Sequence, residues 1–179
     1  MSDLIARDAT ALLAELAARR ISARELLDLS IACHRAVHAR VNAVTATDLE
    51  RARREAQGVD DARARGESMA PLAGLPMTVK DCFDVNGMPA TAGHPGFAKR
   101  NPKVDDAEAV ARVRGAGAIV WGKTNVPFMA GDFQTYNSIY GTTNNPYDLR
   151  RTPGGSSGGA TAALATGITS LEIDRKSVV

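Results

Sequence analysis

The composition of the chain changes near Gly66, and this change most constrains the fold. Residues 1–65 are rich in Ala, Leu and Arg and have a helical period. From Gly66 onward the residues Gly, Pro, Asn and Thr are frequent. This polar region contains two short apolar runs, at 77–79 and 118–121. Because strands that alternate with helices are typical of α/β sheets, we expect a helical region at 1–65 and a sheet-containing region at 66–173.

Local patterns predict several individual elements. Ser22 and Glu25 form a capping box, so a helix is expected to begin there. Asp105 is expected to cap a second helix, because a glutamate follows three residues later. The remaining expectations are a strand at 41–45 and helices at 47–66, 105–114 and 160–165.

Composition excludes several classes of protein. The 22 Lys and Arg nearly balance the 20 Asp and Glu, and a net charge of +2 does not indicate a nucleic-acid-binding surface. The two cysteines are too few for a disulfide framework, and Cys33 lies on an apolar helical stripe, where it is expected to be a core residue. No leader pattern and no apolar stretch of ~18 residues is present. We therefore expect a cytoplasmic protein without membrane contact.

Two local patterns suggest ligand sites that their surroundings disfavour. His34 and His38 lie one helical turn apart but lack an obvious third ligand, so they are expected to be solvated polar residues, and no metal is expected. Residues 117–124 match the P-loop pattern, which would bind a nucleotide. The four residues at 118–121, however, are the best strand candidate in the chain, whereas a P-loop needs them to form a phosphate-binding loop.

Both Ser156 and Ser157 lie within patterns that match the nucleophile elbow of α/β-hydrolases. In those enzymes the catalytic histidine follows the serine, but every histidine of this chain lies upstream, at positions 34, 38 and 94. Residues 144–153 also contain two prolines and are a poor candidate for the strand that precedes an elbow. The elbow interpretation is therefore disfavoured.

Another interpretation pairs a serine with a lysine. The long segment 124–157 has no periodicity, and such segments are uncommon in compact domains unless they line a site. It ends in the Gly/Ser loop at 153–159, which opens a helix but is also similar in composition to a flexible linker. Lys80 follows an apolar run and can act as a general base when held neutral, although a lysine beside Asp81 is ordinarily half of a surface ion pair.

Four blocks of the chain stand out in sequence order: PLAGLPMTVKD at 71–81, GAIVWGKTN at 117–125, YGTTNNPYDL at 140–149 and RTPGGSSGG at 151–159. Together they resemble the amidase signature family, whose members cleave carboxamides with a Ser, cis-Ser, Lys triad. The resemblance implies that Lys80 is the base and that Ser156 is the bridging serine after a cis peptide bond. It further implies that Gly155 leaves room for this bond and that Ser157 is a supporting hydrogen-bonding residue.

The resemblance also implies a fold and a substrate pocket. The fold is an α/β/α arrangement with a mixed sheet, of which this chain would hold the N-terminal part. The residues expected to line the pocket near the scissile bond are Met129, Ala130, Gly131 and Asp132. For Met129 a role in core packing is an equal alternative. The attacking serine of the family would fall near position 180, whereas residues 174–179 do not match the family and Ser177 does not align with that serine.

The expected function is therefore the hydrolysis of carboxylic acid amides through an acyl-enzyme, with no cofactor, by a chain that is itself expected to be an inactive fragment. Its partners would be a small-molecule amide and, as a further possibility, a second copy of the chain. Two alternatives stay open. One is a glutamine-hydrolysing subunit of a tRNA-dependent amidotransferase, which would work with partner subunits and without direct nucleic-acid contact. The other is a non-catalytic interaction domain.

Overall fold

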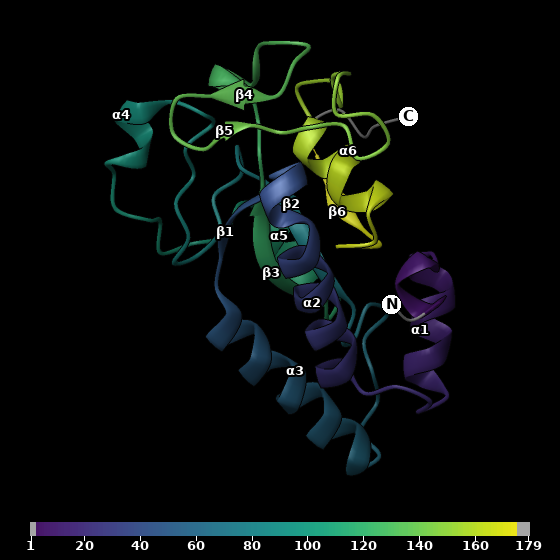
Figure 1. The fold of residues 1–179 in the computed structure, drawn as a ribbon. Helices are drawn as coiled ribbons and strands as arrows, with labels where there is room; N and C mark the ends of the chain where they lie inside the picture. Colours follow the sequence, from purple (N-terminus) through teal and green to yellow (C-terminus); the bar gives the residue numbers. More distant parts are fainter. Residues whose placement is uncertain (1–2, 175–179) are drawn as a thin grey trace.

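A mixed sheet carries the fold in residues 3–174, the part of the chain that the computed structural model describes (Figure 1). Its four strands are β1 (Val44–Thr47), β2 (Pro76–Lys80), β3 (Ile119–Thr124) and β6 (Glu172–Ile173), in the order β1-β3-β2-β6. β2 runs parallel to both β3 and β6, whereas β1 runs antiparallel to β3. A separate antiparallel pair joins β4 (Tyr136–Asn137) and β5 (Gly141–Thr142). The mixed sheet agrees with the expected fold class.

Helices precede, connect and follow these strands (Figure 1). The α-helices are α1 (Ala9–Ala17), α2 (Ala23–Val41), α3 (Leu49–Ala64), α4 (Pro95–Ala98), α5 (Glu108–Gly115) and α6 (Gly158–Ala165). Two short 3-10 helices, η1 (Asp3–Ala6) and η2 (Phe128–Ala130), complete the elements. None of the helices within 3–174 is long and apolar enough to cross a membrane.

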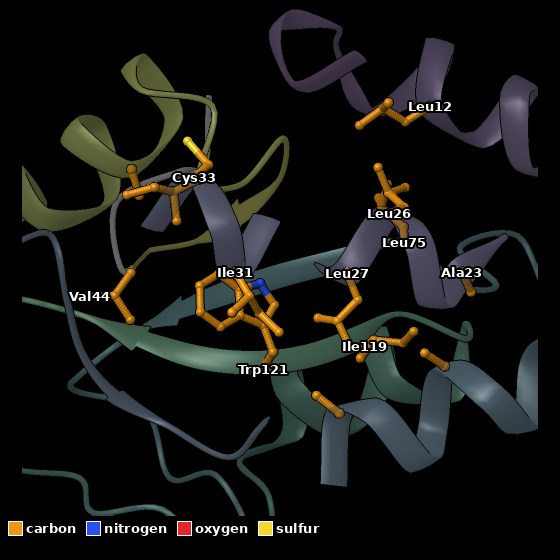
Figure 2. Close-up of a cluster of buried hydrophobic side chains, with 14 of the residues drawn as sticks. Leu12, Ala23, Leu26, Leu27, Ile31, Cys33, Val44, Leu75, Ile119 and Trp121 are labelled. Atoms are coloured by element: carbon orange, nitrogen blue, oxygen red, sulfur yellow. The ribbon is translucent and has the colours of Figure 1, made fainter. Parts of the chain in front are cut away.

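Apolar side chains cover both faces of the sheet. On one face, α1, α2, α3 and α6 pack around Ile119 and Trp121 of β3, as the close-up in Figure 2 illustrates. On the other face, Val110 of α5 packs against Met77 and Val79 of β2. Trp121 is fully buried, and most of its neighbours in the cluster are Ala, Leu, Ile and Val. The inner strand β2 lies between β3 and β6 and packs against α5, which fixes the position of its last residue, Lys80.

Several predicted elements are confirmed, and others need correction. The capping box of Ser22 and Glu25 is present and starts α2. The strand predicted at 41–45 begins only at Val44, because Val41 ends α2 and Asn42 takes a left-handed C-cap conformation. The predicted N-cap Asp105 is wrong, since Ala107 occupies that position without a side-chain cap. The division of the chain into units at residue 66 stays a prediction.

The burial of Cys33 matches the prediction, whereas that of His34 differs from it. Cys33 is buried, as predicted, and its Sγ lies 3.1 Å from the carbonyl oxygen of Thr166. His34 is half-buried and so only partly solvated, because its ring packs edge-on against Trp121 and His38. Burial is the main cause that lowers the pKa of His34 from 6.5 to about 4. This half-buried imidazole therefore packs against the core residue Trp121.

Candidate active site

Lys80 and Ser156, which lie 76 positions apart in the sequence, meet in a buried contact. The Lys80 amine is at the carboxyl end of β2, and its Nζ donates to the Ser156 Oγ at 2.9 Å and to the Ser157 Oγ at 2.6 Å. Lys80 is fully buried and Ser156 is 3% exposed. The lysine and the serine that the resemblance assigns to one triad are therefore in contact, while their catalytic roles stay predictions.

The Gly/Ser loop presents both serines to this lysine. The peptide bond between Gly155 and Ser156 is cis, as the resemblance implied. Ser157 is the N-cap residue of α6, so the first turn of that helix directly follows the two hydroxyls. A P-loop or a linker would not place a fixed pair of hydroxyls against a strand end.

Thr135 joins the two ends of this loop, and the sequence patterns did not reveal it. The Thr135 hydroxyl donates to the carbonyl oxygen of Gly154 at 2.9 Å and accepts from the Gly158 amide at 3.0 Å. Thr135 is fully buried. One side chain from the aperiodic segment thus satisfies two backbone groups that flank the serines. No local sequence pattern points to it, because its partners lie about 20 positions away.

The glycines of the loop allow close backbone packing. A Cβ atom added to Gly159 would stand 2.5 Å from the carbonyl oxygen of Asn125, and one added to Gly155 would stand 2.7 Å from the carbonyl carbon of Phe133. Real Cβ atoms essentially never approach other atoms so closely. The loop that carries Ser156 is therefore fixed against the segment that follows β3.

Among the residues predicted to line a substrate pocket, Asp132 lies against this loop. Met129 and Ala130 both have left-handed backbone conformations, with φ values of 53° and 51°. Met129 is 50% exposed, whereas Ala130 is buried. Gly131 and Asp132 are exposed, and the Asp132 carbonyl lies against Gly155. The alternative of Met129 as a core residue is therefore wrong, and its role toward substrate stays a prediction.

A second buried lysine lies at the same end of the sheet. Lys123 Nζ is 3.0 Å from Asp81 Oδ1 and donates at 2.7 Å to the carbonyl oxygens of Phe83 and Pro89. Asp81 also accepts a hydrogen bond from the hydroxyl of Thr91. Burial raises the pKa of Asp81 and lowers that of Lys123, while their mutual attraction opposes both shifts. Asp81 is thus paired with Lys123 in the interior and not with Lys80 at the surface.

Glu172 is a further polar residue near Lys80 that the sequence patterns did not identify. Its carboxyl oxygens accept hydrogen bonds from Thr78 and, at 2.6 Å, from Thr124. Burial is the main cause that raises the pKa of Glu172 from 4.5 to about 8, and the positive charge of Lys80 opposes this rise. The residue as a whole is partly exposed, but its carboxyl oxygens face two buried threonines. The available sequence signal was an acidic residue between the apolar Leu171 and Ile173.

The competing site hypotheses do not fit the geometry. Residues 119–124 form the buried strand β3, so they cannot form the phosphate-binding loop of a P-loop. Residues 152–156 are not a strand, which an elbow would need before its serine. Within 3–174 no group of three or more His, Cys, Asp or Glu residues is arranged to hold a metal ion. The buried lysine and its two serines remain the arrangement able to relay a proton.

Comparisons with known proteins agree with this geometry. The amidase family model matches residues 25–173. A glutamyl-tRNA(Gln) amidotransferase subunit of Acidothermus cellulolyticus is 44% identical over 92% of this chain and 32% of its own length. The AtzE subunit of 1-carboxybiuret hydrolase from a Pseudomonas species is 42% identical over 88% of this chain and 35% of its own length. The chain therefore spans about a third of the length of these curated relatives.

Solved structures of amidases share the fold of this chain. The crystal structure of an amidase matches with a TM-score of 0.85 at 37% identity. The match covers 93% of this chain and 38% of the amidase chain. A bacterial aryl acylamidase of the amidase signature enzymes has a TM-score of 0.86 at 28% identity over 91% of this chain and 35% of its own. The family match and the shared fold establish that this chain belongs to the amidase family, the amidase signature enzymes.

Proposed function

We propose that this protein is the N-terminal part of an enzyme that hydrolyses carboxylic acid amides, with Lys80 as the base and Ser156 as the bridging serine. The observation that carries the proposal is the buried contact of 2.9 Å between the Lys80 amine and the Ser156 hydroxyl. A lysine in a site that excludes water can act as a base, and Ser/Lys pairs are a known alternative to Ser/His/Asp triads.

In the proposed mechanism a proton moves toward Lys80 through Ser156. The neutral Lys80 amine takes the Ser156 proton, and Ser156 takes the proton of the attacking serine, which we place near position 180, beyond the described residues. The attacking oxygen adds to the amide carbon, and the amine leaves with a proton returned along the same path. Water then hydrolyses the resulting ester. Ser157 supports the amine through its hydrogen bond of 2.6 Å.

The substrate is proposed to lie over the exposed side of the segment 129–132. Met129 is half exposed there, and the backbone of Asp132 lies directly against Gly155. The neighbouring Phe128 and Phe133 are 54% and 84% exposed. These apolar side chains favour an amide with an apolar acyl or amine group, because burying such surface stabilises the complex.

The specific alternative is a glutamine-hydrolysing subunit of a tRNA-dependent amidotransferase. Relatives named as glutamyl-tRNA(Gln) amidotransferase subunits favour it, with identities of 38–44% to this chain. Such a subunit would act with partner subunits, and a cytoplasmic location is part of the proposal for either function. Co-purification of partner subunits with the protein, together with hydrolysis of glutamine in preference to simple amides, would favour this alternative.

The proposal is tested by comparing this chain with an extended version. In the extended protein, residues from Asp174 onward are replaced by the family motif and by the C-terminal part of an active relative. The extended protein is expected to hydrolyse a simple aryl amide, and the chain of 179 residues is not. Equal turnover by both would show that the nucleophile lies within 1–179, and Ser156, Ser157 and Ser177 would then be tested by substitution with alanine. Failure of the extended protein on every amide would favour the interaction-domain alternative.

A further inference from the structure

A carboxyl group is built into the sheet beside Lys80. Glu172 pairs in register with Thr78 of β2, and Lys80 pairs in register with Thr124 of β3. The Glu172 carboxyl accepts hydrogen bonds from the hydroxyls of both threonines. The carboxyl group is therefore held between Thr78, which lies two positions before Lys80 on β2, and Thr124, which lies across from Lys80 on β3.

Strand alternation places this carboxyl group on the same face of the sheet as the lysine. Ile173 packs with Met77 and Val79 on the face covered by α5. Successive side chains of a strand point to opposite faces, so Glu172, Thr78 and Lys80 share the other face. The loop that carries Ser156 lies on that face, at the start of α6.

We propose that Glu172 is a positioning residue whose charge decides whether Lys80 carries a proton, and hence whether Lys80 can act as a base. This inference rests on the proposed function of Lys80. When Glu172 holds a proton, it no longer favours the ammonium form, and Lys80 can accept the proton of Ser156. When Glu172 is a carboxylate, its negative charge favours the ammonium form of Lys80, which cannot accept that proton.

The electrostatic surroundings support such coupling. The pKa of Glu172 is raised to about 8, mainly by burial and to a smaller extent by the charge of the nearby Asp174, whereas the hydroxyls of Thr124 and Thr78 and the charge of Lys80 oppose this rise. The other buried charges at this end of the sheet, Asp81 and Lys123, are paired with each other. Lys80 and Glu172 therefore interact electrostatically from the same face of the sheet, with no second buried acidic group of this end left unpaired among the described residues to compete for Lys80.

The inference is tested by following the lysines of the 179-residue chain by NMR. The sequence has lysines at positions 80, 99, 103, 123 and 176, so the Cε and Nζ resonances of isotopically labelled lysine are few. The Lys80 signal is assigned as the one lost in Lys80→Met. In Glu172→Gln the amide can still hydrogen-bond to both threonines but never carries a charge. The titration midpoint of the Lys80 signal is expected to fall by about one pH unit or more in this variant.

Two controls make the result specific. The Lys123 signal is expected to keep its wild-type titration in Glu172→Gln, because its partner is Asp81. If Glu172→Gln does not fold, Thr78→Val replaces it. This variant removes one hydroxyl that favours the carboxylate, so it is expected to move the Lys80 midpoint in the same downward direction.

An unchanged Lys80 midpoint in the folded variant would overturn the inference. Equal shifts of the Lys80 and Lys123 signals would also overturn it, because they would indicate a general structural change. The NMR measurement involves no turnover, so its outcome is independent of the proposed function. A loss of coupling would leave the role of Lys80 as base intact. Catalysis without Lys80 would refute that role even if the coupling is observed.

Discussion

Replacing Gly159 by alanine tests whether the serine loop depends on backbone-to-backbone packing. The new Cβ would stand 2.5 Å from the carbonyl oxygen of Asn125, so the two segments must separate by about 0.9 Å to restore an ordinary contact of 3.4 Å. The obstacle is backbone, which cannot rotate away as a flexible side chain can. Overpacking of this kind typically costs about 1–3 kcal/mol, and the better helix propensity of alanine returns at most about 1 kcal/mol. We expect a net loss of about 1–2 kcal/mol.

Gly58→Ala is the matched control for this substitution. Gly58 lies on the exposed side of α3, and a Cβ added there meets nothing within 4 Å. The same chemical change is therefore expected to stabilise the protein by about 0.5–1 kcal/mol.

Urea unfolding measures both variants through the fluorescence of Trp121, which is the single tryptophan and is fully buried. For a chain of this size a loss of 1–2 kcal/mol corresponds to a melting temperature lower by about 2–8 °C. A Gly159→Ala protein at least as stable as wild type would refute the packing argument.

Three further predictions concern buried polar groups. Thr135→Val leaves the Gly154 carbonyl and the Gly158 amide without their partner, so it is expected to lower the free energy of unfolding by about 2 kcal/mol, which Thr135→Ser should restore in urea titrations. Lys123→Met leaves the carboxylate of Asp81 buried without its ion-pair partner, with an expected loss of about 3–5 kcal/mol, and the double variant with Asp81→Leu should lose less. The unfolded chain protonates His34 near pH 6.5 and the folded chain only near 4, so stability should fall between these values as the pH decreases, and a His34→Gln variant should show a flatter dependence.

Local patterns predicted the elements whose causes are local. The capping box of Ser22 and Glu25 started a helix as expected, because both partners lie within one turn. The cap predicted at Asp105 failed although its pattern was similar. The neighbouring Asp106 accepts from the amide of Asn86 and forms an ion pair with Arg114 at 3.1 Å, and these distant partners displace the start of the helix.

The candidate site was predicted only in part, and from resemblance more than from periodicity. Lys80 and Ser156 were paired because each lies in a block that resembles the amidase signature family, whereas nothing in a spacing of 76 residues predicts their contact. Thr135 and Glu172 were missed because their hydrogen-bond partners come from other strands or loops. Such groups become visible only once the sheet order and register are known.

The proposed role of Lys80 is tested most directly by its removal from the extended protein. Lys80→Met is compared with Lys99→Met. The control replaces an exposed lysine at the end of α4 and removes the same charged group. The assay is kcat/KM for an aryl amide that the extended protein hydrolyses. We expect Lys80→Met to lower this value by about three powers of ten or more and Lys99→Met to leave it unchanged. Retention of wild-type kcat/KM by a folded Lys80→Met protein would contradict the proposal that Lys80 is the base.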